Sequence, residues 1–145
     1  MTPAGLIQRF VAAFLDSVVI MFIQYAFSLV IFLVLPEGGS RARIAMVMSV
    51  LVGLAAGALY YALMESSKRR GTLGKILVEI EVIDMDGFTL DFGEAIWRHL
   101  WRLVSVMTLG FGFLMAGWNE QGLALHDRMS GTRVVVKEEV FEEEE

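Results

Sequence analysis

Two long runs of apolar residues occupy the first half of the chain. The first run extends from Phe10 to Leu35 and contains one charged residue, Asp16, and one other strongly polar residue, Gln24. The second run extends from Ile44 to Met64 and contains no charge. A bilayer core about 30 Å thick needs roughly 20 apolar residues in helical form. We therefore predict two transmembrane helices.

A short polar segment joins these two runs. It reads Pro-Glu-Gly-Gly-Ser over residues 36–40, a composition that breaks helices and favours a turn. Helices joined by so short a loop are expected to be antiparallel neighbours. The first run is too long for the apolar part of a signal peptide, and no small-residue cleavage pattern closes it. We therefore expect it to remain in the protein as a span.

A third apolar run is shorter and allows two predictions. It extends from Leu103 to Trp118, with Trp101 just before it. At about 1.5 Å per residue, residues 101–118 cover roughly 25 Å, which barely crosses a bilayer. Gly110-Phe-Gly112 near the middle suits the apex of a re-entrant hairpin, whereas the flanking tryptophans favour a span. Both paths stay open on these grounds.

The distribution of Lys and Arg favours the re-entrant path. If the third run crosses the membrane, seven basic residues lie on one side and five on the other. If it is re-entrant, ten lie on the side of the N-terminus and only Arg41 and Arg43 lie opposite. Basic residues concentrate on the cytoplasmic side of membrane proteins. On either path we predict a cytoplasmic N-terminus and a cytoplasmic connection over residues 65–102.

The connection between the second and third runs predicts a small structured unit. Residues 76–84 alternate apolar and polar side chains, as a half-buried strand does. Asp86-Gly87 is typical of a type I′ turn, and residues 88–90 would return as a short strand to give a cytoplasmic β-hairpin. Residues 132–136 are also β-prone and could pair with residues 76–84. The predicted fold class is an all-α membrane protein with this small β unit.

A further helix is predicted to begin at Asp91, because Asp91 and Glu94 have the spacing of a capping box. One stripe of this helix is aromatic and the next is basic. The residues of the two stripes are Trp97 and Trp101, and Arg98 and Arg102. We expect both stripes to face the headgroup layer of the cytoplasmic leaflet.

Composition supports a lipid environment and restricts the chemistry. Hydrophobic residues make up 56% of the 145 residues, more than the roughly 45–50% that soluble domains contain. There is no cysteine, which excludes disulfides and thiolate metal sites. The net charge of −5 reflects an acidic tail over residues 137–145, which holds six of the seventeen acidic residues and is expected to be disordered.

Asp16 is the most informative single residue, because it lies inside the first predicted span. A carboxylate there is costly and is a functional candidate by default, the alternative being a structural Asp bonded to a neighbouring helix. Arg9 precedes it by seven residues and shares its helix face, but lies roughly 10 Å away along the axis. We therefore expect Asp16 to find its partner elsewhere.

Small residues follow one stripe of the second span. They are Ala45, Ser49, Gly53 and Gly57. Small residues let helix backbones approach closely in lipid. We expect this stripe to be a helix-packing surface, either for the first span or for a second copy of the chain.

The remaining motifs do not indicate an enzyme, a cofactor, a metal site or a nucleic-acid partner. Gly71-Thr-Leu-Gly74-Lys75 fails the spacing of a phosphate-binding loop. His99 and His126 are the two histidines of the chain, and no His, Cys, Asp or Glu spacing matches a dedicated metal site. For His126 we expect a structural hydrogen-bonding role.

Several of these motifs, taken in order, resemble the RDD family of membrane proteins. The matching segments are residues 9–16, Thr72-Leu-Gly74-Lys75, Val82-Ile-Asp84 with Gly87, Arg98, and residues 126–135. The family is named for one Arg and two Asp, which correspond here to Arg9, Asp16 and Asp127. The other motif residues are expected to be structural: Thr72, Gly74, Lys75, Arg98, His126, Gly131 and Thr132. The resemblance implies one domain over residues 5–136, multi-pass in the bacterial cytoplasmic (inner) membrane.

The resemblance also implies two functions of different classes. Some RDD proteins are reported to exchange Na⁺, Li⁺ or K⁺ for protons, with Asp16 here as the carrier and Asp127 and Arg9 as its partners. A carboxylate can hold a proton or a cation but not both, which is the competition that exchange requires. So short a chain is expected to form a homo-oligomer. The alternative is a non-transporting accessory or assembly subunit, which would bind other membrane subunits through the small-residue stripe and the hairpin.

Overall fold

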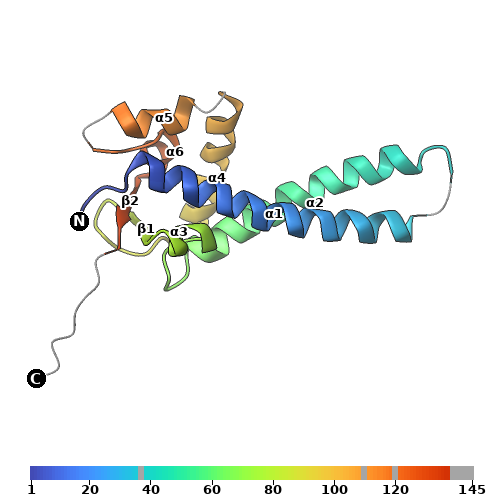
Figure 1. Cartoon of the computed structure of the whole chain (residues 1–145), viewed down its shortest axis with the longest axis horizontal. Helices are drawn as coiled ribbons and strands as arrows, with labels where there is room; N and C mark the ends of the chain where they lie inside the picture. The colour runs from blue at the N-terminus through green and yellow to red at the C-terminus, as the bar shows by residue number, and fades with distance from the viewer. Residues whose placement is uncertain (36–37, 109–110, 119–120, 138–145) are drawn as a thin grey trace, which may run out of the picture.

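The computed structural model describes residues 1–35, 38–108, 111–118 and 121–137, apart from the side chain of Phe113. Two long antiparallel helices, α1 (Leu6–Val34) and α2 (Arg41–Glu65), extend away from a group of shorter elements (Figure 1). These shorter elements all lie at one end of the helix pair, beside the N-terminus. The connection between α1 and α2 lies at the opposite end.

Both long helices expose their apolar side chains. In the most apolar 18-residue windows, 0% of the α1 residues and 6% of the α2 residues are buried within the chain. The core helix of a soluble protein would be mostly buried, which these two helices are not. Both helices are long and apolar enough to cross a membrane. The two predicted helices are therefore confirmed as candidate spans.

Two residues of the small-residue stripe of α2, Ser49 and Gly53, face Gln24 of α1. Gln24 of α1 donates from Nε2 to the carbonyl oxygen of Ser49 at 2.6 Å. A Cβ placed on Gly53 would lie 1.8 Å from Gln24 Oε1. Gly53 therefore leaves room for a hydrogen bond between the two helices. At this point the stripe packs on the first span, which is one of the two surfaces expected for it.

After α2 the chain forms a short helix and then a strand. α3 (Leu73–Leu77) precedes β1 (Ile80–Asp84), and Glu79 between them has a φ of +57°. The strand predicted over residues 76–84 is therefore wrong before residue 80. The apolar and polar alternation of residues 76–84 could not reveal α3, because α3 packs against α1, which lies far away in the sequence.

The strand that pairs with β1 comes from near the end of the chain. β2 (Thr132–Val136) runs antiparallel to β1 in a two-stranded sheet, with Val82 opposite Val134. The pairing considered between residues 132–136 and the earlier strand is thus confirmed. The same sheet reaches the N-terminus, because Pro3 forms an isolated bridge with Val135.

The predicted β-hairpin is wrong in its return strand. A turn does form, and Gly87 has a φ of +94°, but residues 88–90 are not a strand. Two isolated backbone hydrogen bonds form along that edge of β1 instead. The Val82 amide donates to the Arg70 carbonyl at 2.6 Å, and the Asp84 amide donates to the Phe88 carbonyl at 3.1 Å.

α4 (Phe92–Met107) begins with the predicted capping box. The Glu94 amide donates to Asp91 Oδ1 at 2.7 Å, and the Asp91 amide donates to Glu94 Oε2 at 2.9 Å. Asp91 and Glu94 thus satisfy two amides that the first helical turn leaves unpaired.

The third apolar run is divided between two helices. Its first part belongs to α4, and its second part forms α5 (Phe111–Trp118), which α6 (Leu125–Ser130) follows. Within the described ranges, α1 and α2 alone are candidate spans, and α4 ends at Met107 with Thr108 as its C-cap. The re-entrant path stays a prediction, since Gly110 at its apex lies outside the described residues. The acidic tail after residue 137 also lies outside them.

The folded end of the molecule combines a small apolar core with a polar interior. The core residues are Ala4, Ala12, Ala62, Ile80, Val82, Leu90, Ala95 and Val134. α4 turns Arg98 (0% exposed) and Arg102 (8%) inward and leaves Trp97 51% exposed. The expectation that both arginines face lipid headgroups is therefore wrong. They point inward because carboxylates from α2 and α6 lie there.

Candidate functional site

Asp16 is buried where α1 meets α3. Its carboxylate accepts hydrogen bonds from the Tyr60 hydroxyl at 2.8 Å, the Thr72 hydroxyl at 2.6 Å and the Gly74 amide at 2.9 Å. All of these donors are neutral. Among the residues that the structure describes, no Lys, Arg or His forms an ion pair with Asp16.

Gly74 lets α3 touch α1 at this carboxylate. A Cβ on Gly74 would lie 2.2 Å from the carbonyl oxygen of Ala12 and 2.9 Å from Asp16 Oδ1. A side chain cannot occupy that space, so the close approach of the two backbones requires glycine. The Thr72-Leu-Gly74 segment therefore binds a carboxylate of its own chain.

A second polar cluster surrounds Glu65, the last residue of α2, which is 0% exposed. Lys75 Nζ donates to Glu65 Oε1 at 2.5 Å, and Arg102 Nη2 donates to the same oxygen at 2.7 Å. Arg98 Nη1 donates to Oε2 at 3.0 Å. One buried carboxylate thus holds cations from α3 and α4. Burial lowers the pKa of Lys75 to about 7, against the opposing effect of Glu65.

Asp127 of α6 is held by two arginines. Arg9 Nη1 donates to Asp127 Oδ2 at 2.5 Å, and Arg98 Nη2 donates to Oδ1. Arg98 also donates from Nε to the Thr132 hydroxyl at 2.9 Å. Burial alone would raise the pKa of Asp127, but the guanidinium groups of Arg98 and Arg9 hold that pKa well below its ordinary value. Arg98 therefore connects the carboxylates of α2 and α6.

His126 and Gly131 complete this region from α6. The ring Nδ1 of His126 lies 3.3 Å from the Ser105 hydroxyl oxygen. Burial lowers the pKa of His126 well below its ordinary value, so the imidazole is neutral. Gly131 ends α6 in the left-handed conformation, with a φ of +64°. That turn directs the chain into β2, where Thr132 accepts from Arg98.

Comparison with known proteins identifies the family. The sequence profile of the RDD family matches residues 3–131 of the 145-residue chain. The chain belongs to the RDD family. It is also 29% identical over 149 residues to "Uncharacterized protein YxaI" of Bacillus subtilis (strain 168), an alignment that covers 93% of this chain and 98% of that protein. No solved structure matches it.

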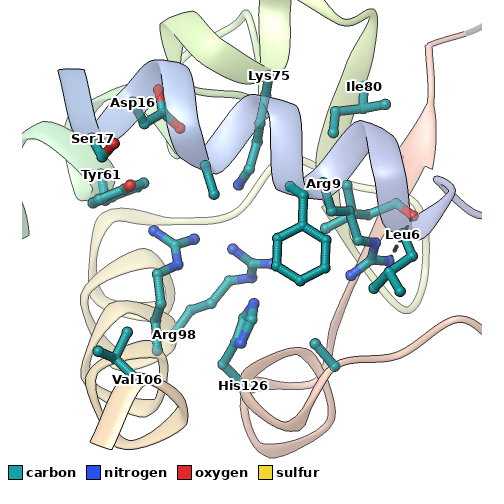
Figure 2. Close-up of a pocket in the computed structure, with 15 residues that line it drawn as sticks. Leu6, Arg9, Asp16, Ser17, Tyr61, Lys75, Ile80, Arg98, Val106 and His126 are labelled. Atoms are coloured by element: carbon teal, nitrogen blue, oxygen red, sulfur yellow. Dashed lines mark hydrogen bonds between the residues drawn. The ribbon is translucent and has the colours of Figure 1, made fainter. Parts of the chain in front are cut away.

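In this RDD protein the three namesake residues occupy two separate places. Arg9 and Asp127 pair with each other, while Asp16 binds the neutral donors described above. A cavity of 240 Å³ lies between them and is lined by both Arg9 and Asp16. Figure 2 shows these two side chains at opposite ends of the cavity, with Lys75 reaching into it from α3. Two residues of the predicted set, Arg9 and Asp16, therefore line one cavity. Asp127 is not among its lining residues, and Asp16 contacts neither predicted partner.

Glu65 and Tyr60 belong to the site of this RDD protein although no local pattern marks them. Glu65 follows an apolar run directly, which is typical of the solvated end of a span. The basic residues of the folded end could have pointed to Glu65. Three basic residues of the folded end need a buried acidic partner, and they are Lys75, Arg98 and Arg102.

Proposed function

We propose that this RDD membrane protein exchanges a monovalent cation for a proton at Asp16. One observation carries the proposal. Glu65 and Asp127 are buried carboxylates paired with arginines, whereas Asp16 is 1% exposed and receives only neutral donors within the described residues. A fixed arginine would already neutralise a carboxylate, whereas the charge of Asp16 is left for a proton, Na⁺, Li⁺ or K⁺ to neutralise.

The hydroxyl groups around Asp16 suit both states of such a carrier. Tyr60 and Thr72 donate to the ionised carboxylate, and each hydroxyl oxygen also has lone pairs that can accept a proton or ligate a cation. The same oxygens would therefore serve the protonated and the cation-bound forms in turn. We propose that the transporting unit is a homo-oligomer, because two spans are few to enclose an ion path.

Transport is tested by cation-driven proton flux in vesicles that contain only the purified protein. We expect exchange in the wild type and a fall to background in Asp16→Asn, because an amide keeps the shape but cannot carry the charge. Asp86→Asn, an exposed position, is the matched control and should keep wild-type flux. Thermal unfolding of all variants checks that they fold.

The same experiment separates the two functional classes. An Asp16→Asn variant that folds and still exchanges would contradict the role of Asp16. No flux from folded wild-type protein would overturn self-sufficient transport. It would favour an accessory or assembly subunit, and a stoichiometric partner should then co-purify.

We propose that the end of the molecule with the N-terminus lies on the cytoplasmic side of the bacterial inner membrane. Support comes from β2, which pairs with β1 beside the N-terminus. Ten Lys and Arg residues then belong to this end, against Arg41 and Arg43 at the other. This is the positive-inside pattern. The apolar surface of α4 and α5, which includes exposed Trp97, Met107 and Trp118, would lie at half depth.

Single cysteines test this orientation, because the native chain has none. We expect Gly39→Cys to react with an impermeant thiol reagent applied to intact cells. Val140→Cys should react only after the cells are permeabilised. Labelling of Val140→Cys from outside would mean that the third apolar run crosses the membrane.

A further inference from the structure

The cavity is surrounded by more positive than negative charge. Its basic lining residues are Arg9, Lys75, Arg98 and Arg102. The carboxylates that line it or pair with those residues are Asp16, Glu65 and Asp127. Lys75, Arg98 and Arg102 all bind the one carboxylate of Glu65. Like charges held this close disfavour one another in a buried site, and an anion beside them would relieve that repulsion.

Two of these cations keep unused donors at the same place. Lys75 Nζ and Arg102 Nη2 both donate to Glu65 Oε1, at 2.5 and 2.7 Å. Arg102 Nη1 is buried and has no hydrogen-bond partner among the described residues. The Lys75 ammonium has three N–H groups, and within the described residues Glu65 is the one acceptor found for them. A buried donor without an acceptor is unfavourable, and an anion with several oxygens would satisfy it.

Arg102 is held in position for such a role. Its guanidinium carbon lies 3.9 Å from the centroid of the Tyr61 ring, and Glu65 fixes its other end nitrogen. The Arg102 side chain is 10% exposed, so little water competes for its donors. A guanidinium that is already ordered loses little entropy when a ligand binds.

Apolar side chains line the same cavity at the surface of the molecule. Phe10 of α1 is 49% exposed and Val106 of α4 is 60% exposed, and both line it. Figure 2 shows Val106 on α4, below the guanidinium groups. The volume of 240 Å³ is below the roughly 300–1,000 Å³ of small-molecule sites. The space therefore suits one compact charged group. An apolar substituent on that group would extend out of the cavity between Phe10 of α1 and Val106 of α4.

We propose that this cavity binds one phosphate-bearing anion, with Lys75 and Arg102 as its hydrogen-bond donors. Phosphate brings several acceptor oxygens and negative charge to the side of the cavity where Lys75 and Arg102 lie. The headgroup of an anionic phospholipid and a free phosphate share this chemistry. A lipid would in addition lay its acyl chains along Phe10 and Val106. The proposal does not rest on exchange at Asp16, because the donors that it assigns to the anion belong to Lys75 and Arg102.

Native mass spectrometry of the purified full chain tests the lipid source. The protein is equilibrated in detergent with equal amounts of phosphatidylglycerol and phosphatidylcholine. We expect one phosphatidylglycerol to be retained per chain in preference to phosphatidylcholine. Arg102→Gln should weaken this retention about tenfold or more, since it removes charge-assisted hydrogen bonds. Arg69→Gln removes an exposed charge and should leave retention unchanged, which separates the cavity from general surface attraction.

A second pair of variants leaves the charge network intact. Val106→Trp fills the cavity from α4, whereas Val104→Trp alters a valine on the same helix that is 39% exposed and does not line the cavity. Only Val106→Trp should lose retention. This pair keeps the test informative if Arg102→Gln does not fold.

To test whether the ligand is free phosphate, inorganic phosphate is added to the protein in neutral detergent and the thermal unfolding midpoint is measured. A rise of the wild-type midpoint that Val106→Trp lacks, without retained phosphatidylglycerol, would assign the site to free phosphate. The proposal is overturned if the wild type neither retains phosphatidylglycerol nor responds to phosphate. It is equally overturned if folded Val106→Trp and Arg102→Gln bind as the wild type does. Neither readout depends on ion flux, so failure here is distinct from failure of transport.

Discussion

Replacing Glu65 by Gln is expected to destabilise the folded end by about 3–5 kcal/mol, or to prevent it from folding. Glu65 accepts from Lys75, Arg98 and Arg102, so its loss would leave three buried cations without their shared counter-ion. Glutamine keeps the size and one acceptor oxygen but not the charge. Thermal unfolding of the purified protein, followed through the tryptophan fluorescence of α4, measures the effect.

Glu81→Gln is the matched control for this substitution. Glu81 lies 3.8 Å from Arg70 in an ion pair at the surface of the folded end, with side chains 15% and 33% exposed. Its loss should cost about 0–1 kcal/mol. Adding Lys75→Met to Glu65→Gln removes one stranded cation and should recover part of the lost stability, as coupled sites do. Equal unfolding midpoints for the two glutamine variants would contradict the central role of Glu65.

Gly74→Ala is expected to separate α3 from α1. The added Cβ would lie 2.2 Å from the Ala12 carbonyl oxygen, and backbone atoms at such a contact cannot both stay in place. Overpacking of this kind costs about 1–3 kcal/mol. The Gly74 amide would also lose its hydrogen bond to Asp16, so cation exchange should fall together with stability. Unfolding midpoint and vesicle flux are both measured.

Gly57→Ala is the control for Gly74→Ala. Both glycines are helical, so both substitutions gain the same helix propensity of about 1 kcal/mol. A Cβ on Gly57 would meet nothing within 4 Å. We expect Gly57→Ala to unfold at the wild-type temperature or above it. If Gly74→Ala did the same, the close contact of α3 with α1 would not be needed for stability.

Short sequence patterns correctly predicted those elements that are determined by neighbouring residues in the chain. The two apolar runs became α1 and α2, and Asp91 and Glu94 cap α4 as their spacing indicates. The predictions failed where the cause lies far along the chain. Residues 73–77 form a helix whose Gly74 amide binds Asp16, 58 positions earlier in the chain, and the partner of β1 is β2 rather than residues 88–90.

The site was predictable in part. An acidic residue within an apolar run singles out Asp16 by the cost of placing a charge there, but its donors come from α2 and the start of α3. The spacing of Arg98 and Arg102 shows that they share a helix face. It does not show that this face is the inner one, because on a helix beside lipid the apolar side can point outward. Only the position of Glu65 and Asp127 decides this.

The bond between Arg9 and Asp127 joins residues 118 positions apart, and the Val136 amide donates to the carbonyl of Thr2 at 2.9 Å. During synthesis on the ribosome, α1 and α2 are complete long before α6 and β2 emerge. Until then Arg9 has no Asp127 to bind, and the first residues have no strand to join. The folded end can therefore close only when the last strand has been made, after both long helices are complete. A nascent chain that stops before residue 127 would therefore have both long helices, but its folded end would stay open.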